Sequence, residues 1–329
     1  YDGRTWSVGR VTMPLADYTA KLMPPPDVIH LHWVGNGMLS VGEIARFKTP
    51  IVWTLHDMWA LTGGCHYAAD CTRYSESCGR CPALGSTRDE DLSRHTFNAK
   101  ARAWRDLSLT LVTPSLWLAQ CVRESALLRY QRLEVIPNPI DIHTFKPLDK
   151  THARAVFNLP TDKKLVLFSA MYWGDRYKGY HHLVAALKHL RGRDDLALVT
   201  VGQGDSTPLT QFGLPLYHVG LIQDARLMAL LYAAADVLVV PSEQDNLPNA
   251  VMEALACGTP TAAFRIGGIP DMVEHTVTGY LAPPFDARAL ADGIVWLTDD
   301  ADRAHHLSTQ ARHRACERYA AEVIAMRYA

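Results

Sequence analysis

From residue 237 to residue 260 the chain reads VLVVPSEQDNLPNAVMEALACGTP, which predicts a strand, a loop and a helix in succession. The apolar run at residues 237–240 is typical of a parallel strand buried on both faces of its sheet. Pro248 suits the first turn of a helix, and Gly258 is a residue type at which helices commonly end. The loop is therefore expected at the carboxyl end of a parallel sheet, where open α/β sheets bind ligands and a helix N-terminus favours phosphate.

The same alternation of short apolar runs and helix-length segments continues along the chain and favours parallel α/β units. We predict helices that include residues 180–190, 224–235 and 311–328, and strands at residues 28–32, 51–55, 109–113, 134–136, 165–170, 197–201, 237–240 and 261–264. The turn-rich stretch 137–147 indicates a boundary between two lobes, at residues 1–145 and 146–310. Because a doubly wound lobe usually has about six strands, we expect the first lobe to be incomplete and to lack an N-terminal segment.

The composition excludes several classes of protein. The chain has 329 residues, 33 Lys and Arg against 34 Asp and Glu, and no apolar stretch long enough to cross a membrane. Balanced charge argues against a nucleic-acid partner, because such proteins usually carry a clustered basic excess. Seven cysteines, an odd number, without an export signal indicate the reducing cytoplasm.

Two carboxylates, Asp245 and Glu253, flank the start of the predicted helix and could hold hydroxyl groups of a polyol at two points. The segment resembles the Glu-x7-Glu signature of the retaining GT-B glycosyltransferases of family four. The strings at residues 264–273 and 278–282 are similar to the strand and Gly-Gly-x-Pro loop that follow in that family. The resemblance covers nearly the whole chain and implies two Rossmann-like, doubly wound lobes facing a cleft, with a C-terminal helix at residues 311–329 that packs back on the first lobe.

The resemblance also implies roles for residues of the second lobe. Glu253 would bind the ribose of a nucleotide-sugar, and Asp245 would face the donor sugar. Asp245 stands where the family usually has Glu, so its reach is one methylene shorter. The usual Gly-Phe-Gly loop is Asn246-Leu247-Pro248 here, which leaves the preferred donor sugar open. The donor-binding residues implied in this way are Asn246, Leu247, Glu253, Gly202, Gly267 and Gly268.

The predicted loop after residue 170 carries the basic residues Arg176 and Lys178. Lys178-Gly179 matches the family's Lys-Gly element, whereas Tyr172 stands at the place of its usual Arg, for which Arg176 could substitute. Two cations at this position would stabilise the leaving diphosphate, which gains charge in the transition state. From the residues alone, a solvated loop of mixed charge remains the alternative.

In the first lobe, His56 follows a predicted strand and could bind sugar or phosphate, or shuttle a proton. It matches a functional histidine of the family, although a packed histidine bonded to backbone is the alternative from the residues alone. His32 ends the preceding strand and is a candidate on the acceptor side, whereas His30 is expected to be structural.

Four cysteines, Cys65, Cys71, Cys78 and Cys81, have the spacing C-x5-C-x6-C-x2-C within residues 63–84. Four thiolates with a terminal C-x2-C suit a tetrahedral structural Zn²⁺, and such a site leaves no open position for catalysis. Two disulfides or free thiols are the alternatives. This Cys-rich segment resembles an insertion seen in a bacterial subset of these transferases.

The resemblance implies metal-independent, retaining transfer of a hexosyl group from a UDP- or GDP-sugar to a saccharide or lipid-linked acceptor in surface polysaccharide biosynthesis. We expect a cytoplasmic protein that contacts the inner face of the membrane. Two alternatives remain open, because Asp245 departs from the family pattern and the N-terminal segment is expected to be missing. One is a nucleotide-sugar-binding module without turnover. The other is a further kind of GT-B enzyme, such as a phosphorylase or sugar-nucleotide epimerase.

Overall fold

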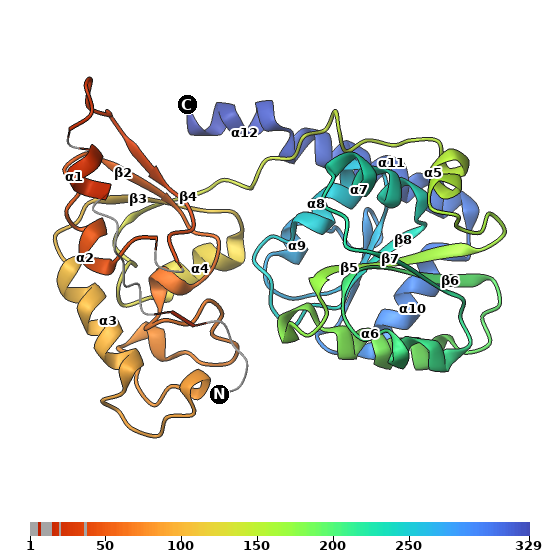
Figure 1. The fold of residues 1–329 in the computed structure, drawn as a ribbon, viewed down its shortest axis with the longest axis horizontal. Coiled ribbons are helices and arrows are strands. Elements are labelled where there is room, and N and C mark those ends of the chain that lie inside the picture. The colour runs from red at the N-terminus through yellow and green to blue at the C-terminus, as the bar shows by residue number, and fades with distance from the viewer. Residues whose placement is uncertain (1–5, 8–14, 20, 36–37) are drawn as a thin grey trace. The chain divides into compact units, whose positions relative to one another are not determined.

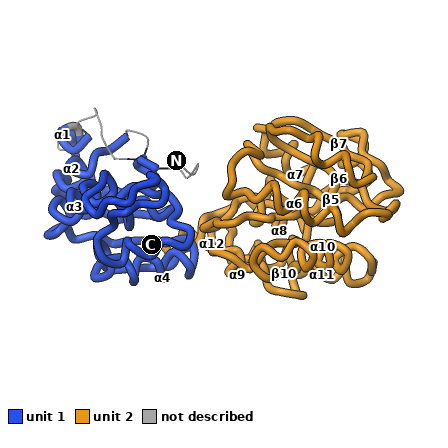
Figure 2. The backbone as a smooth tube through the Cα atoms, turned by 90° about the horizontal axis from the view of Figure 1, so that it is seen from below, with its two compact units in different colours: residues 1–136 blue, residues 137–329 orange. Residues whose placement is uncertain are grey.

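The computed structural model of the chain describes residues 6–7, 15–19, 21–35 and 38–329. The chain forms two compact units, Tyr1–Ile136 and Pro137–Ala329 (Figure 2). We call them unit 1 and unit 2. Each contains one parallel sheet and its own hydrophobic core.

Unit 2 is built on a six-stranded sheet whose order is β10-β9-β8-β5-β6-β7, with every neighbouring pair parallel. Its strands are β5 (Lys164–Tyr172), β6 (Leu196–Gln203), β7 (Leu216–Gly220), β8 (Val237–Val240), β9 (Thr261–Phe264) and β10 (Gly279–Ala282). The chain first extends the sheet to one side of β5 and then returns to add β8 on the other side. This is the doubly wound order, and its switch point lies between β5 and β8.

Helices cover both faces of this sheet (Figure 1). Alternate residues of β5 point to opposite faces, so that Leu165 and Leu167 join one core, and Val166 and Phe168 join the other. The first core packs against α7, α8 and α11, and the second against α6 and α10. The helices of unit 2 are α5 (Lys150–Val156), α6 (Tyr180–Leu187), α7 (Ala225–Ala234), α8 (Asn249–Ala256), α9 (Ile269–Met272), α10 (Ala287–Thr298), α11 (Ala301–Tyr319) and α12 (Ala321–Tyr328).

Residues 137–145, which the sequence analysis placed in the first lobe, belong to unit 2. The physical reason is their attachment to α11. The Arg312 guanidinium donates hydrogen bonds of 2.8 Å and 3.1 Å to the carbonyls of Phe145 and Ile142. The N–H of Ile140 donates to the carbonyl of Tyr319 at 2.7 Å. The predicted C-terminal helix is divided at Ala320 between α11 and α12, and its packing on the first lobe stays a prediction.

Unit 1 has a four-stranded parallel sheet in the order β1-β2-β3-β4 within its described residues. The strands are β1 (Ile29–Leu31), β2 (Ile51–Thr54), β3 (Leu109–Thr113) and β4 (Arg132–Val135), and the helices are α1 (Leu15–Thr19), α2 (Val41–Ile44), α3 (Leu92–Ala103) and α4 (Leu116–Glu124). Asp91 caps α3 by accepting from the N–H of Arg94, and Ser115 caps α4 by accepting from that of Leu118. In the core, Trp53 packs edge-on against Trp104 with ring centroids 5.5 Å apart.

All eight predicted strands are present; β3, β8 and β9 have the predicted bounds, and the other five have shifted ends. The two strands outside that prediction, β7 and β10, are the edges of the sheet in unit 2. β7 is only half-buried along most of its length, so it lacks the continuous apolar run that marks the central strands. Within the described part of the chain, no helix is both long and apolar enough to span a bilayer.

Candidate functional site

Two loops meet at the switch point of unit 2: residues 173–179, after β5, and residues 241–248, after β8. Their backbones are in contact. The N–H of Glu243 donates to the carbonyl of Tyr177 at 2.9 Å. Gly179 has φ +66°, and a Cβ there would lie 1.8 Å from the carbonyl oxygen of Pro241. Glycine is therefore required at position 179, and the close approach fixes one loop against the other.

The side chains of Lys178 and Asp245 join the same two loops, with Nζ 2.7 Å from Oδ2. Asp245 is buried, with 6% of its surface exposed. Burial opposes the charge on Lys178, but the neighbouring carboxylates of Asp245 and Asp175 outweigh it and raise the pKa of the ammonium. Lys178 therefore remains a cation at neutral pH, at the edge of the sheet where the sequence predicts a diphosphate.

The Gly-Gly loop before α9 supports Asp245 from the other side. The N–H of Gly268 donates to the carbonyl of Asp245 at 3.1 Å. Gly267 has φ +51°, and a Cβ there would lie 1.9 Å from that carbonyl oxygen. Two loops that are distant in sequence thus hold Asp245, one at its carboxylate and the other at its backbone carbonyl.

α8 begins at Asn249 with Pro248 as its N-cap, one residue later than predicted, and the three candidate residues in and before it face different surroundings. Leu247 is buried in the core of unit 2, so its backbone rather than its side chain is the part available to a ligand. Glu253, on α8, accepts a hydrogen bond of 2.8 Å from the Tyr232 hydroxyl. Burial raises the pKa of Glu253, and the Tyr232 hydrogen bond offsets part of that rise. Asn246 is buried with 3% of its surface exposed.

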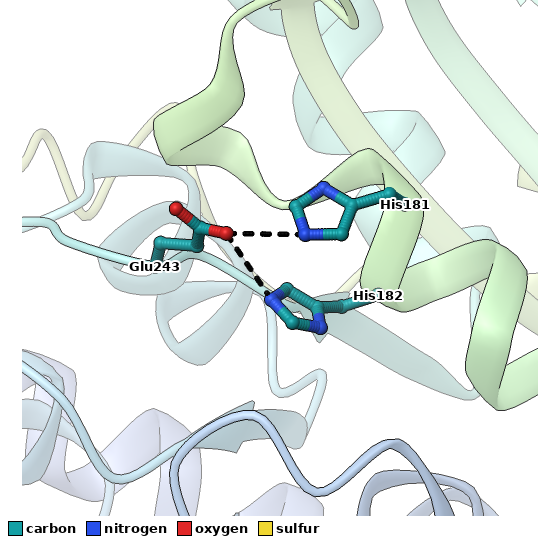
Figure 3. Close-up of side chains that lie close together, drawn as sticks. All are labelled: His181, His182 and Glu243. Carbon is teal, nitrogen blue, oxygen red and sulfur yellow. Dashed lines mark ion pairs between the residues drawn. The ribbon is translucent and has the colours of Figure 1, made fainter. Parts of the chain in front are cut away.

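Glu243, to which the sequence analysis assigned no role, lies beside His181 and His182 (Figure 3) and also pairs with Arg176. The Nε2 atoms of His181 and His182 lie 3.1 Å and 3.4 Å from its Oε1, and Arg176 Nε lies 3.1 Å from its Oε2. The two histidines and Glu243 are three ligand-type groups that could hold a metal ion. Because Arg176 already binds the same carboxylate, however, the cluster also serves to fix Arg176 beside the two loops.

Close packing explains why the residue at position 202 is a glycine. Gly202 has φ +110°, and a Cβ there would lie 1.7 Å from the carbonyl oxygen of Ala170 on β5. Trp173 covers the same turn by donating from Nε1 to the carbonyl of Val201 at 3.0 Å. A role of Gly202 in donor binding remains a prediction.

In unit 1, His32 and His56 lie at the carboxyl ends of β1 and β2. Nδ1 of His32 is 3.0 Å from Nε2 of His56, and the two rings are stacked. Burial, and then the charge of His32, lower the pKa of His56, so that its imidazole is neutral at pH 7. His30 is 2.8 Å from the Thr54 hydroxyl, in agreement with a structural role. A pocket at this end of the sheet is lined by residues that include His32, His56, Asp57, Trp33, Trp53 and Trp59.

Asp57 organises this pocket, although the sequence analysis did not single it out. Its Oδ2 accepts from Nε1 of Trp33 at 2.8 Å and lies 2.6 Å from Nδ1 of the buried His66. Its Oδ1 accepts from the N–H of Trp59 at 2.8 Å. The sequence pointed to Asp57 and His66 only through their neighbours, because Asp57 follows His56 and His66 follows Cys65, and both neighbours were candidate residues.

The four clustered cysteines line a second pocket of unit 1. The pKa of the Cys81 thiol is lowered to about 6, first by a hydrogen bond from Cys65 and then, against the effect of burial, by the N–H groups of Leu84 and Ala83. Burial raises the pKa of Cys78 to about 11. The cluster therefore contains sulfur atoms in unlike environments.

The structure brings Lys178, Asp245, Gly267 and Gly268 together, and it places Arg176 beside them through Glu243. Glu253 lies further along α8, and Gly202 lies at the end of β6. His32 and His56 form a separate pair in unit 1. The functional roles of these residues remain predictions.

Two Rossmann-like units, each built on a parallel sheet, define the GT-B class of glycosyltransferases, and the solved structures agree. The structure is similar to sucrose-phosphate synthase of Thermosynechococcus elongatus, with a TM-score of 0.74 and 26% identity, over 95% of this chain and 74% of that chain. Its fold is also similar to that of HepE of Anabaena in complex with UDP and glucose, with a TM-score of 0.72 and 18% identity, over 96% of this chain and 80% of that chain.

Two family models together span most of the chain. The model described as Glycosyltransferase Family 4 matches residues 7–144, and the model described as Glycosyl transferases group 1 matches residues 162–300. The chain belongs to the family-four glycosyltransferases. It is 28% identical over 305 residues to D-inositol 3-phosphate glycosyltransferase of Thermobispora bispora, a match that covers 88% of this chain and 66% of that protein. A match to the protein of that name from Mycolicibacterium smegmatis covers 60% of the relative. The chain thus spans about two thirds or less of the length of these relatives.

Proposed function

We propose that the chain transfers a hexosyl group, with retention of configuration, from a UDP- or GDP-sugar to a saccharide or lipid-linked acceptor. The observation that carries this proposal is the Lys178–Asp245 pair at the switch point of the doubly wound sheet, because that is where such sheets bind ligands. It is supported by family membership and by a protein of like fold that was crystallised with UDP and glucose.

On the donor side, Lys178 and Arg176 would stabilise the negative charge that develops on the leaving diphosphate. Asp245 would face the donor sugar, and the backbone of Asn246 and Leu247 would lie near sugar and phosphate. Glu253 would accept hydrogen bonds from the ribose hydroxyls. The buried Asp245 is held by Lys178 at its carboxylate and by the N–H of Gly268 at its carbonyl, so its carboxylate would need little reorganisation when the sugar binds.

On the acceptor side, His32 and His56 would contact the incoming saccharide. The neutral imidazole of His56 can accept a hydrogen bond from an acceptor hydroxyl. Trp33 is 41% exposed beside them and offers an apolar face of the kind that packs against a sugar ring.

In the proposed reaction, the bond between the anomeric carbon and the diphosphate oxygen breaks, and the acceptor oxygen bonds to the same face of that carbon. The acceptor proton passes to the departing phosphate oxygen. The two cations of unit 2 neutralise the leaving group, so no catalytic metal is required in this scheme. We further propose that the reaction serves the synthesis of surface polysaccharide in the cytoplasm, at the inner face of the membrane.

A thermal-shift panel of UDP, GDP, ADP and CMP tests the donor site. A nucleotide at about 100 times its Kd should stabilise the protein by roughly 2.7 kcal/mol. We expect a shift with UDP or GDP that is lost in Glu253→Ala and kept in Glu90→Ala, a change of an exposed carboxylate. No shift with any nucleotide in a sample that melts cooperatively would contradict the proposal.

A product assay with the preferred nucleotide-sugar then tests turnover. We expect a glycoside whose anomeric configuration equals that of the donor, as seen by proton NMR coupling constants. Nucleotide binding without a product, over a panel of saccharide and lipid-linked acceptors, would instead favour a binding module.

A further inference from the structure

We propose that Cys65, Cys71, Cys78 and Cys81 bind one structural Zn²⁺ ion, which fixes the acceptor-side pocket of unit 1. The proposal does not depend on the donor chemistry of unit 2. All four residues line one pocket, together with Thr62, Ala68, Arg73, Tyr74, Gly79 and Ser93. Cys65, Cys78 and Cys81 are buried, and none of the four is in a disulfide. Four cysteines that line one pocket can supply the four sulfur ligands of a tetrahedral Zn²⁺ site.

The backbone around the C-x2-C pair is shaped to present sulfur atoms. Cys78, Gly79 and Arg80 all have positive φ, of 54°, 92° and 45°, which turns the chain sharply between the two cysteines. The N–H of Gly63 donates to Cys78 Sγ at 3.2 Å. Backbone N–H groups directed at thiolate sulfur are the outer-shell contacts that orient and stabilise metal ligands.

The turn is also anchored to α3. Asp91, the N-cap of that helix, accepts from the N–H of Cys81 at 2.8 Å and from the Ser93 hydroxyl at 2.6 Å. The Ser93 hydroxyl accepts in turn from the N–H of Gly79 at 2.9 Å. The C-x2-C pair is therefore held by a fixed helix end rather than by a free loop.

A tetrathiolate zinc site carries a net charge of −2, and two buried or lining cations are placed to offset it. Lys100, on α3, is fully buried and donates to the carbonyl of Thr62 at 2.9 Å and to that of Trp59. The same Thr62 donates to the carbonyl of Cys65 at 2.7 Å. Arg73 lines the pocket itself. Burial lowers the pKa of Lys100 to about 7, against the opposite effect of Cys78, Asp57 and Cys65. Because a buried ammonium needs an anionic neighbour, a negatively charged metal site would favour the charged form of Lys100.

Metal binding requires the sulfur atoms to move closer together. Among the described residues, no three of the four sulfur atoms lie within 4.8 Å of one another. Binding would draw them into a tetrahedron and release the thiol protons to solvent, up to four for each Zn²⁺ bound. No oxidant or reductant is needed.

The same segment reaches the acceptor-side pocket, which gives the metal its role. Cys65 is followed directly by His66, whose ring is 2.6 Å from Asp57. The carbonyl of His66 accepts from the N–H of Met58 at 2.8 Å. Asp57 in turn positions Trp33 and Trp59. A metal bound at Cys65 would thus order His66, Asp57 and the aromatic wall of the pocket.

The test is metal and thiol analysis of the full chain, purified and then equilibrated with Zn²⁺ under reducing conditions. We expect about one Zn²⁺ per chain, as a four-thiolate site predicts. With Co²⁺ in its place, the protein should show the visible bands of a tetrahedral thiolate complex. The variant Cys81→Ser should lose the metal, whereas Cys316→Ser, a half-buried cysteine in unit 2, should keep it.

Because Cys81→Ser could fail to fold, the wild-type protein carries the decisive result. Absence of bound metal with seven titratable thiols would overturn the proposal in favour of free cysteines. Absence of metal with only three titratable thiols would overturn it in favour of two disulfides. Hydrogen exchange gives the second readout: removing Zn²⁺ with a chelator should speed exchange at residues 57–66 and leave α8 unchanged. Unchanged exchange at residues 57–66 would refute the proposed link to the pocket.

Discussion

Lys178 Nζ lies 2.7 Å from Asp245 Oδ2, across 67 residues of sequence, and this ion pair joins the loops after β5 and β8. It lies at the switch point of the doubly wound sheet, which is where sheets of this kind bind ligands. The pair holds a cation and a carboxylate side by side before any ligand is bound. The proposed donor site is therefore charged and positioned in advance.

Replacing Lys178 by methionine should lower both stability and transfer. The buried Asp245 would lose a charged donor, which should reduce the free energy of unfolding by about 1–3 kcal/mol. Loss of a cation at the leaving diphosphate should reduce transfer by roughly 10²-fold. Urea unfolding and initial rates measure the two effects. Lys188→Met, a change of an exposed lysine in the same region, is the matched control and should change neither. Full activity of Lys178→Met would exclude the proposed role.

Gly267→Ala should displace Asp245, whereas Gly213→Ala should not. Both glycines have positive φ, of 51° and 81°, so backbone strain alone should cost each alanine about 1 kcal/mol, and the clash at Gly267 adds to that cost. Only at Gly267 does the new Cβ meet the carbonyl of Asp245, since nothing lies within 4 Å of a Cβ at Gly213. We expect nucleotide binding, measured by calorimetry, to weaken at least tenfold in Gly267→Ala alone. Equal binding by the two variants would show that the Gly-Gly loop does not hold the acid.

Glu253→Gln should alter the pH dependence of stability. Burial raises the pKa of Glu253 in the folded protein, so between the ordinary value of 4.5 and the raised value the folded state binds more protons than the unfolded state. This carboxyl therefore makes the free energy of unfolding fall as pH rises through that window. Glu253→Gln removes this dependence and should be more stable than the wild type at pH 7.

The same substitution should weaken nucleotide binding, by roughly 10-fold to 100-fold if a charged hydrogen bond to ribose is lost. Urea unfolding at pH 4.5, 5.5 and 7, together with nucleotide titration, measures both effects. Glu90→Gln should follow the wild type in each experiment. A Glu253→Gln variant that is less stable than the wild type at pH 7 would contradict a net cost of burying the Glu253 carboxylate.

His56→Gln should remove an acid sensitivity. The pKa of His56 is lowered from 6.5 by burial and by His32, so below pH 6.5 the unfolded state binds more protons than the folded state. The free energy of unfolding should therefore fall as pH decreases from 6.5, and His56→Gln should flatten that decrease. Transfer at pH 7 should drop at least tenfold if the imidazole accepts from the acceptor. His305→Gln, at an exposed position of α11, is the control for both measurements.

The central strands of both sheets and the helix after Pro248 could be predicted because their pattern is local. An apolar run such as Val237–Val240 can be stable only when covered on both faces, and a proline followed ten residues later by a glycine delimits a helix. β7 could not be predicted in the same way. At the edge of the sheet it is half-buried, so its sequence is not constrained to be apolar.

The predicted boundary after residue 145 lies nine residues beyond the boundary between the two units, which follows Ile136. The turn-rich composition of residues 137–147 marks a linker, but it does not say which unit the linker joins. The bonds from Arg312 to the carbonyls of Ile142 and Phe145 settle that question, and they come from a helix more than 160 residues later.

The sequence by itself determined the family, the two α/β units and most candidate residues, because each can be recognised from contiguous residues and from the spacing between them. Only the tertiary structure decided which charges meet. Glu243 gathers Arg176 with two histidines, Tyr232 donates to Glu253, and Asp57 holds His66. The first contact arises where the loops after β5 and β8 meet at one edge of the sheet, the second where α7 packs against α8, and the third within the long segment after β2. The partners in the first contact are set by strand order, which no local pattern of residues encodes.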